Sequence, residues 1–193
     1  MDKKLSEMTQ EELWQLFPIF LTEHQDCWKD WYEEEEMILK SLLPQTAKLH
    51  HIGSTAIRTI RAKPIIDILA EIPRECQMSS MKELLEKNHY ICMSQSSDRI
   101  SFNKGYTEQG FAERVFHLHV RFIGDNEELY FRDYLNKHPD IAREYEEMKL
   151  ALWKEYKYNR DGYTNAKSDF VNKYTSISRR KYKEKRQKID EKP

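Results

Sequence analysis

The sequence predicts an α+β domain in which a mixed β-sheet is covered by helices and the last third of the chain is helical. Short apolar runs typical of strands are grouped between about residues 47 and 122. A helical pattern at 26–43 precedes this group, and helical periodicity extends from about residue 126 to 181. Strands gathered in the middle of a chain with helices on either side favour a sheet with segregated helices.

Length and composition indicate one folded domain. The chain has 193 residues, about the length of one domain, and 12% of them are aromatic, which is too many for a disordered protein. No run of about 18 apolar residues occurs, and residues 1–7 lack the apolar core of a signal peptide. Membrane spanning and secretion are therefore disfavoured.

The cysteines indicate a reducing compartment. Cys27, Cys76 and Cys92 are widely spaced and form no Cys-x-x-Cys pair. This spacing argues against both a disulfide framework and a zinc knuckle. We therefore expect a cytoplasmic protein.

The first elements are a strand and a helix. Residues 16–23 are predicted to form an opening strand, followed by a helix over 26–43. The acidic run Glu33 to Glu36 is predicted on the solvent side of that helix. Its inward residues are predicted to be Trp28, Trp31, Tyr32, Ile38, Leu39 and Leu42.

The remaining elements follow from apolar runs and turn residues. Two strands are predicted at 47–52, ending at Gly53, and at 64–71, closed by Pro73. After a helix at 78–88, further strands are predicted near 90–94, 99–104 and 113–122. The helical last third is predicted to break near 138–139 and 161–162.

A basic tail follows a single domain, which we place at residues 1–177. Residues 178–193 hold eight Lys or Arg against three acids, so the tail carries +5 and the body −6. A basic tail can recruit nucleic acid, but an acidic body repels phosphate and the tail has only Tyr182 as an aromatic. Nucleic acid is thus disfavoured as a partner, and a solvated end of the last helix is the favoured interpretation.

Gly53, Ser54 and Thr55 form a candidate phosphate-binding turn. They follow a predicted strand and are expected to open a helix, where free N–H groups attract an anion. An ordinary strand-to-helix turn is the alternative. Cations follow between this turn and the next strand, at Arg58, Arg61 and Lys63. They would offset the charge of a polyphosphate, although loop cations are commonly just solvated.

Asp67 is the one charged residue in the centre of an otherwise apolar strand. A carboxylate there requires a cation, a metal ion or several hydrogen-bond donors, or a place at the open end of the strand. Binding to the N–H groups of a loop is the structural alternative. Because Asp67 lies one strand after the Gly-Ser turn, we expect a metal-binding carboxylate facing a phosphate site.

His117 and His119 lie in a strictly alternating segment, 114–122. Alternation places Phe116, Leu118, Val120 and Phe122 on one face of the strand. The two imidazoles then project from the other face, together with Arg121. Two histidines at this spacing commonly hold one divalent ion, and a simple solvent-facing pair is the alternative.

Five blocks of the sequence resemble the GrpB family in order. They are His51-Ile52-Gly53-Ser54-Thr55-Ala56, Ala62-Lys63-Pro64-Ile65-Ile66-Asp67-Ile68, His117-Leu118-His119-Val120, Phe131-Arg132-Asp133-Tyr134-Leu135 with His138-Pro139, and Tyr163-Thr164-Asn165-Ala166-Lys167 with Phe170-Val171. That family is similar to the nucleotidyltransferase superfamily of polymerase-β-like fold. The resemblance implies a nucleotide-binding domain, with Gly53 and Ser54 contacting phosphate and Asp67 as a metal ligand.

The sequence also departs from the superfamily pattern. The superfamily carries paired carboxylates two residues apart on one strand, whereas Ile65 and Leu69 flank Asp67 at that distance. The strand expected to supply a third carboxylate has His117 and His119 instead. A single divalent ion (Mg, Mn or Zn) held by Asp67, His117 and His119 is more consistent with these residues than a two-metal site.

The leading hypothesis is a nucleotidyltransferase-like enzyme that acts on a nucleotide or phosphorylated small molecule. Lys63 and Arg99 are expected to offset phosphate charge. Lys167 is expected to point into the cleft from the C-terminal helices, although a lysine at the margin of an apolar stripe commonly reaches solvent. The alternatives are a non-catalytic nucleotide or coenzyme sensor and a metal-dependent phosphohydrolase.

Overall fold

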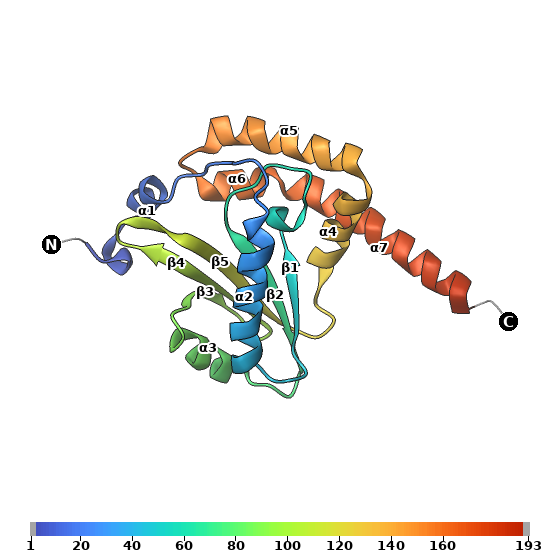
Figure 1. Ribbon diagram of the computed structural model, residues 1–193, viewed down its shortest axis with the longest axis horizontal. Helices are drawn as coiled ribbons and strands as arrows, with labels where there is room; N and C mark the ends of the chain where they lie inside the picture. The colour runs from blue at the N-terminus through green and yellow to red at the C-terminus, as the bar shows by residue number, and fades with distance from the viewer. Residues whose placement is uncertain (1–2, 191–193) are drawn as a thin grey trace.

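The computed structural model describes residues 3–190 and has one mixed sheet as its centre (Figure 1). Within these residues, the strands lie in the order β1-β2-β5-β4-β3. Their bounds are β1 (Lys48–Ile52), β2 (Ile66–Ile72), β3 (Ile91–Gln95), β4 (Arg99–Thr107) and β5 (Gly110–Phe122). The central pair β2 and β5 is parallel, and the other pairs are antiparallel. The predicted α+β class with a mixed sheet is confirmed.

The helices fall before, between and after the strands. Their bounds are α1 (Gln10–Leu16), α2 (Cys27–Leu42), α3 (Met78–Glu86), α4 (Glu127–Lys137), α5 (Pro139–Tyr156), α6 (Arg160–Ala166) and α7 (Ser168–Asp190). In the part of the chain that the structure describes, two 3-10 turns, η1 (Leu5–Glu7) and η2 (Ser54–Ala56), complete the order. The helix break at His138-Pro139 is confirmed, because Pro139 lacks an N–H and opens α5 as its first residue.

One face of the sheet forms the main core with α2 and α3. Strand residues alternate between faces, so every second side chain of β2 and β5 points into this core. Those side chains are Ile66, Ile68, Ala70, Ile72, Phe116, Leu118 and Val120. Trp28 and Leu39 of α2 and Leu85 of α3 pack against them and are fully buried. The predicted alternation of the last strand is confirmed.

A second core lies among the C-terminal helices. It joins Ile57 and Ile60, which follow β1, to apolar residues of α4, α5 and α7. Its buried members from these helices are Phe131, Leu135, Ala142, Tyr145 and Tyr174. In Figure 1, α5, α6 and the start of α7 cross the upper end of the sheet. The second core therefore holds these helices beside the end of β2 at which that strand begins.

The predicted opening strand at 16–23 is wrong. Residues 10–16 form α1, and the segment after it has irregular backbone apart from a single bridge between Thr22 and Ala62. Pro18 lacks an N–H and disfavours strand pairing. The segment is apolar because Phe17, Ile19 and Leu21 are buried as it crosses the end of the sheet, so burial alone explains the pattern.

Two residues of α2 lie on the opposite side from that predicted. Glu35 was expected in solvent, but it is 4% exposed and bonds to Lys104 Nζ at 2.5 Å and to the Tyr90 hydroxyl. Ile38 was expected in the core and is 45% exposed. A buried carboxylate is tolerated here because a cation and a hydroxyl satisfy it.

The predicted basic tail, the helices and the cysteines can each be compared with the sequence expectations. The helix α7 continues through residues 178–190 of the predicted basic tail, and residues 191–193 of that tail lie outside the described residues. Among residues 3–190, no helix has the length and apolarity needed to cross a bilayer. The three cysteines are unpaired, as predicted.

Candidate functional site

A cavity of about 330 Å³ lies between the sheet and the C-terminal helices. Four cations line it: Lys63 before β2, Lys149 of α5, Arg160 of α6 and Lys167 after α6. The other predicted site residues in its lining are Gly53, Ser54, Thr55, Asp67, His117 and His119. The fold therefore brings most of the predicted site residues together, whereas Arg58, Arg61 and Arg99 lie outside the cavity lining.

Gly53 is the point at which β1 turns into the cavity wall. Its φ is +70°, a conformation that glycine adopts without strain, and Ser54 begins a single 3-10 turn rather than a longer helix. Thr55 is buried, and its hydroxyl donates to the Ile65 carbonyl at 3.3 Å and bonds to His51 at 2.9 Å. The Thr55 side chain is thus engaged within the protein.

Asp67 and His117 face each other across the parallel pair β2 and β5. The two residues are register partners, and Asp67 Oδ1 lies 3.1 Å from His117 Nδ1. The other ring nitrogen, Nε2, lies 2.8 Å from the Tyr106 hydroxyl, to which Arg160 donates at 2.8 Å. A continuous hydrogen-bonded chain therefore runs from Arg160 through Tyr106 and His117 to Asp67.

The Asp67 carboxylate is stabilised in its charged form. Burial works to raise its pKa, but the hydrogen bond from His117 and the charges of His117, His119 and Lys63 outweigh burial. The pKa of Asp67 is consequently below its ordinary value. The cavity thus holds an anionic carboxylate at neutral pH.

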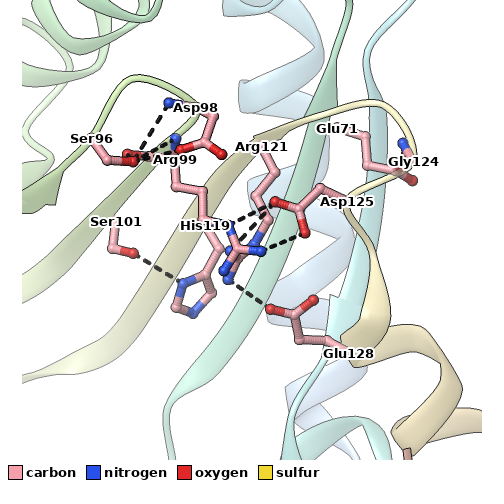
Figure 2. Close-up of polar contacts among 10 residues, drawn as sticks. All are labelled: Glu71, Ser96, Asp98, Arg99, Ser101, His119, Arg121, Gly124, Asp125 and Glu128. Atoms are coloured by element: carbon pink, nitrogen blue, oxygen red, sulfur yellow. Dashed lines mark hydrogen bonds and ion pairs between the residues drawn. The ribbon is translucent and has the colours of Figure 1, made fainter. Parts of the chain in front are cut away.

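His119 shares the cavity face but has a different partner. Its Nδ1 lies 3.3 Å from the Ser101 hydroxyl of β4, and Figure 2 shows the ring directed toward that strand. Burial lowers the pKa of His119 to about 4. The imidazole is therefore neutral at physiological pH.

The residues present do not fit the predicted metal centre. Asp67, His117 and His119 line one cavity, but within residues 3–190 no three or more His, Cys, Asp or Glu side chains are grouped so as to hold an ion. Both ring nitrogens of His117 are engaged, with Asp67 and with Tyr106. A metal at His117 would have to displace one of these partners.

A second acid does occur on β2, four residues after Asp67. Glu71 is 2% exposed and accepts hydrogen bonds from Gly124 N at 2.8 Å and Asn126 Nδ2 at 3.0 Å. It also contacts His50 at 2.9 Å. Figure 2 places Glu71 beside Gly124 in the turn after β5, so this carboxylate anchors that turn.

Two of the cations pack on one tyrosine ring. The Nζ atoms of Lys63 and Lys167 lie 5.3 and 4.3 Å from the ring centroid of Tyr163, which is 1% exposed. Lys149 is also 1% exposed, and its ammonium donates to the Arg61 carbonyl. Cation–π contacts and one hydrogen bond hold these ammonium groups at the cavity.

The three lysines share a lowered pKa. Burial, followed by the charge of Lys167, lowers the pKa of Lys63 and of Lys149 to about 7. Burial lowers the pKa of Lys167 to about 8, although Asp67 opposes the shift. It is therefore unfavourable for all three lysines to be charged at once in the cavity without an anion beside them. A bound anion would stabilise the charged forms and raise the pKa of these lysines.

Arg99 lies outside the cavity lining. Its guanidinium makes a two-pronged contact with Asp125, with Nε and a terminal nitrogen at 2.8 and 2.9 Å from the carboxylate oxygens. Figure 2 shows Arg99 and Arg121 converging on this acid. Arg121 also bonds at 2.6 Å to Glu128, the second acid in the cavity lining.

Sequence reasoning missed Lys149, Arg160 and Tyr106. Lys149 is four residues after Tyr145 and seven after Ala142, both buried, so helical spacing places it on the buried stripe of α5. That spacing was a usable signal. Tyr106 reaches His117 only because β4 and β5 shift register between Lys104 and Tyr106.

Comparisons with known proteins agree with the sequence resemblance. Residues 18–176 match the model of the family described as "GrpB protein". The glutamate-rich protein GrpB of Alkalihalophilus pseudofirmus is 33% identical over 159 residues, covering 79% of this chain and 91% of that protein. A UPF0157 protein of Pseudomonas aeruginosa is 36% identical over 72% of this chain, which spans only 58% of that relative.

Solved structures show the same likeness. The crystal structure of the conserved protein GrpB from Enterococcus faecalis aligns with a TM-score of 0.72 and 29% identity, covering 84% of this chain and 99% of that one. The Cid1 poly(U) polymerase bound to MgATP aligns with a TM-score of 0.49 and 12% identity over 69% of this chain and 44% of its own. The second likeness is too slight to bear on activity.

Proposed function

The chain belongs to the GrpB family, and from that premise we propose that its cationic cavity binds a nucleotide or another phosphorylated small molecule on a nucleotidyltransferase-like domain. The convergence of Lys63, Lys149, Lys167 and Arg160 on one cavity supports this proposal. Ammonium and guanidinium groups are the usual partners of phosphate in proteins.

The charge balance of the cavity also favours an anionic ligand. Two acids lie in its lining, and one of them, Glu128, is paired with Arg121. Lys63 and Lys167 face the ring of Tyr163 rather than a carboxylate oxygen. Among residues 3–190 the structure shows no hydrogen-bond acceptor for these two ammonium groups, and a ligand with several phosphate oxygens would supply such acceptors.

Nucleotidyl or phosphoryl transfer is the second candidate function. The hydrogen-bonded chain from Arg160 through Tyr106 and His117 to Asp67 favours it, because such a chain holds an imidazole in one orientation beside the ligand cavity. Transfer is less well supported, because Asp67 has no second carboxylate two residues away: those positions are Ile65 and Leu69. Binding of a phosphorylated ligand is therefore the function that the geometry supports best.

Calorimetric titration tests the proposal. We expect nucleoside triphosphates to bind the wild-type protein at fixed salt, and Lys167→Ala to weaken binding about tenfold, the loss that corresponds to one charge-assisted hydrogen bond. Lys173→Ala is the matched control, because Lys173 packs on the ring of Tyr174 in the same way but is exposed and outside the cavity.

The outcome separates the candidate functions. Equal affinities in wild type, Lys167→Ala and Lys173→Ala would show that the nucleotide does not bind in this cavity. With bound nucleotide, release of pyrophosphate that requires an acceptor identifies a transferase. Release of phosphate without an acceptor identifies a hydrolase, and binding without turnover identifies a sensor.

A further inference from the structure

A second cavity, of about 250 Å³, lies beside the cationic one and has a different chemistry. It is formed where the irregular segment after α1 crosses the start of β5. Three phenylalanines, Phe17, Phe20 and Phe111, stand in its wall together with apolar residues. Those residues are Pro18, Ile19, Pro64, Ile65, Ala112 and Val115. We call it the phenylalanine cavity.

The two cavities share part of their walls. Lys63, Ile65 and Arg160 line both the phenylalanine cavity and the cationic cavity. The shared cations stand at the boundary between an aromatic region and a region lined by further lysines. One ligand that extends from one cavity to the other would pass directly beside Lys63 and Arg160.

The aromatic rings form a wall of packed, mutually tilted faces. The centroid of Phe111 lies 5.0 Å from that of Phe17 and 6.2 Å from that of Phe20. Phe17 is buried, at 3% exposed, whereas Phe20 and Phe111 are partly exposed and also line the cavity. Aromatic faces can bind planar groups by stacking.

We propose that the phenylalanine cavity holds the planar, uncharged part of the ligand whose phosphates lie in the cationic cavity. The ligand class is therefore a nucleotide or another phosphate ester of an aromatic group, rather than a sugar phosphate or inorganic polyphosphate. This inference rests on the proposed function. It adds a specificity region that the Lys and Arg side chains alone cannot provide, because cations recognise the phosphates of all such ligands alike.

The remaining charged side chain of this cavity agrees with that ligand class. Glu113 is exposed at the wall, and its carboxylate accepts hydrogen bonds but donates none. A carboxylate repels phosphate and accepts from the amino group of a base such as adenine, cytosine or guanine. The negative charge of Glu113 thus favours one orientation of the ligand, with the base in the phenylalanine cavity and the phosphates toward Lys167.

The test compares two probes on three variants. ATP and inorganic tripolyphosphate are titrated into wild type, Phe20→Ala, Phe20→Leu and Tyr182→Ala at one salt concentration. Phe20 is the residue to change because it is partly exposed, whereas removal of the buried Phe17 would harm folding. Tyr182 is an exposed aromatic residue of α7 and lies outside both cavities.

We expect Phe20→Ala to weaken ATP binding about tenfold and to leave tripolyphosphate affinity unchanged. Phe20→Leu should recover only part of the loss, because it fills space without a π face, and Tyr182→Ala should behave as wild type. Unchanged ATP affinity in Phe20→Ala, while Lys167→Ala still weakens it, would overturn this inference and leave the proposed function standing. An equal loss of affinity for both probes would also overturn it. If neither ATP nor tripolyphosphate bound the wild-type protein, the proposed function itself would be overturned.

Discussion

Gly53 and Asp67 are packed so closely that no side chain fits at Gly53. A Cβ atom placed on Gly53 would lie 2.9 Å from the Cβ of Asp67 and closer still to its Oδ2. The positive φ of Gly53 adds a second reason for glycine, because other residues are strained there. The turn that closes the cavity and the carboxylate on β2 therefore position each other.

Gly53→Ala is expected to destabilise the protein by about 2 to 3 kcal/mol, from backbone strain and from displacement of Asp67. Urea unfolding measures the change. Gly124→Ala is the matched control, since Gly124 also has a positive φ, of +96°, but nothing lies within 4 Å of the added Cβ. Its cost should be about 1 kcal/mol. Equal costs for the two variants would contradict the close packing of Gly53 on Asp67.

The lysine pKa values predict that ligand binding takes up protons. At pH 7.5 the lowered pKa of Lys63 and Lys149, about 7 in each case, leaves these groups partly neutral. A bound phosphate favours their charged forms and raises their pKa. Affinity for ATP should therefore fall as the pH rises from about 7 to 9. Titration in two buffers of different ionisation enthalpy measures the proton uptake directly.

Lys167→Arg provides the control for this pH dependence. The pKa of Lys167 is lowered to about 8, so this lysine also loses its charge between about pH 7 and 9. Arginine stays charged throughout that range, so the variant should lose less affinity for ATP than wild type does. Equal binding at both pH values in wild type, with no proton uptake, would show that the lysines are fully charged before the ligand arrives.

The same lysines are predicted to reduce stability near neutral pH. A lysine whose folded-state pKa is lowered disfavours folding fully below that pKa, and the penalty shrinks as the pH rises toward the unfolded value near 10.5. Lys63→Met should therefore raise the free energy of unfolding by about 1 kcal/mol at pH 7. Its advantage over wild type should decrease toward pH 10. An advantage that is constant with pH would assign the gain to packing alone.

Some of the site follows directly from patterns in the sequence. The strict alternation of 114–122 predicts that His117 and His119 share a face, and β5 presents both to the cavity. The Gly-Ser pair after an apolar run likewise predicts a turn near the carboxylate of the next strand. These predictions succeed because both depend on local periodicity and on a backbone conformation that few residues adopt.

Other parts depend on tertiary contacts that no local pattern contains. The alternation of Phe17, Ile19 and Leu21 is the same in a strand and in a buried irregular segment, so the opening strand was predicted wrongly. Tyr106 meets His117 through a register shift beside Gly105, which has a φ of +87°. An isolated glycine in a strand indicates a bulge, but it does not say which side chains the bulge aligns.

Asp67→Asn separates a cation-lined site from a metal-dependent one. Without added metal, removal of the carboxylate should raise the affinity for ATP several-fold, because a negative charge in the cavity repels the phosphates. The variant should also lose about 1 to 3 kcal/mol of stability, since the His117 hydrogen bond loses its charged acceptor and Lys63 loses a neighbouring negative charge. Calorimetry with and without Mg²⁺, together with urea unfolding, measures both effects. If wild type binds ATP only with Mg²⁺ and Asp67→Asn abolishes that binding, Asp67 acts as a metal ligand once nucleotide is present, and the cation-only description of the cavity is wrong.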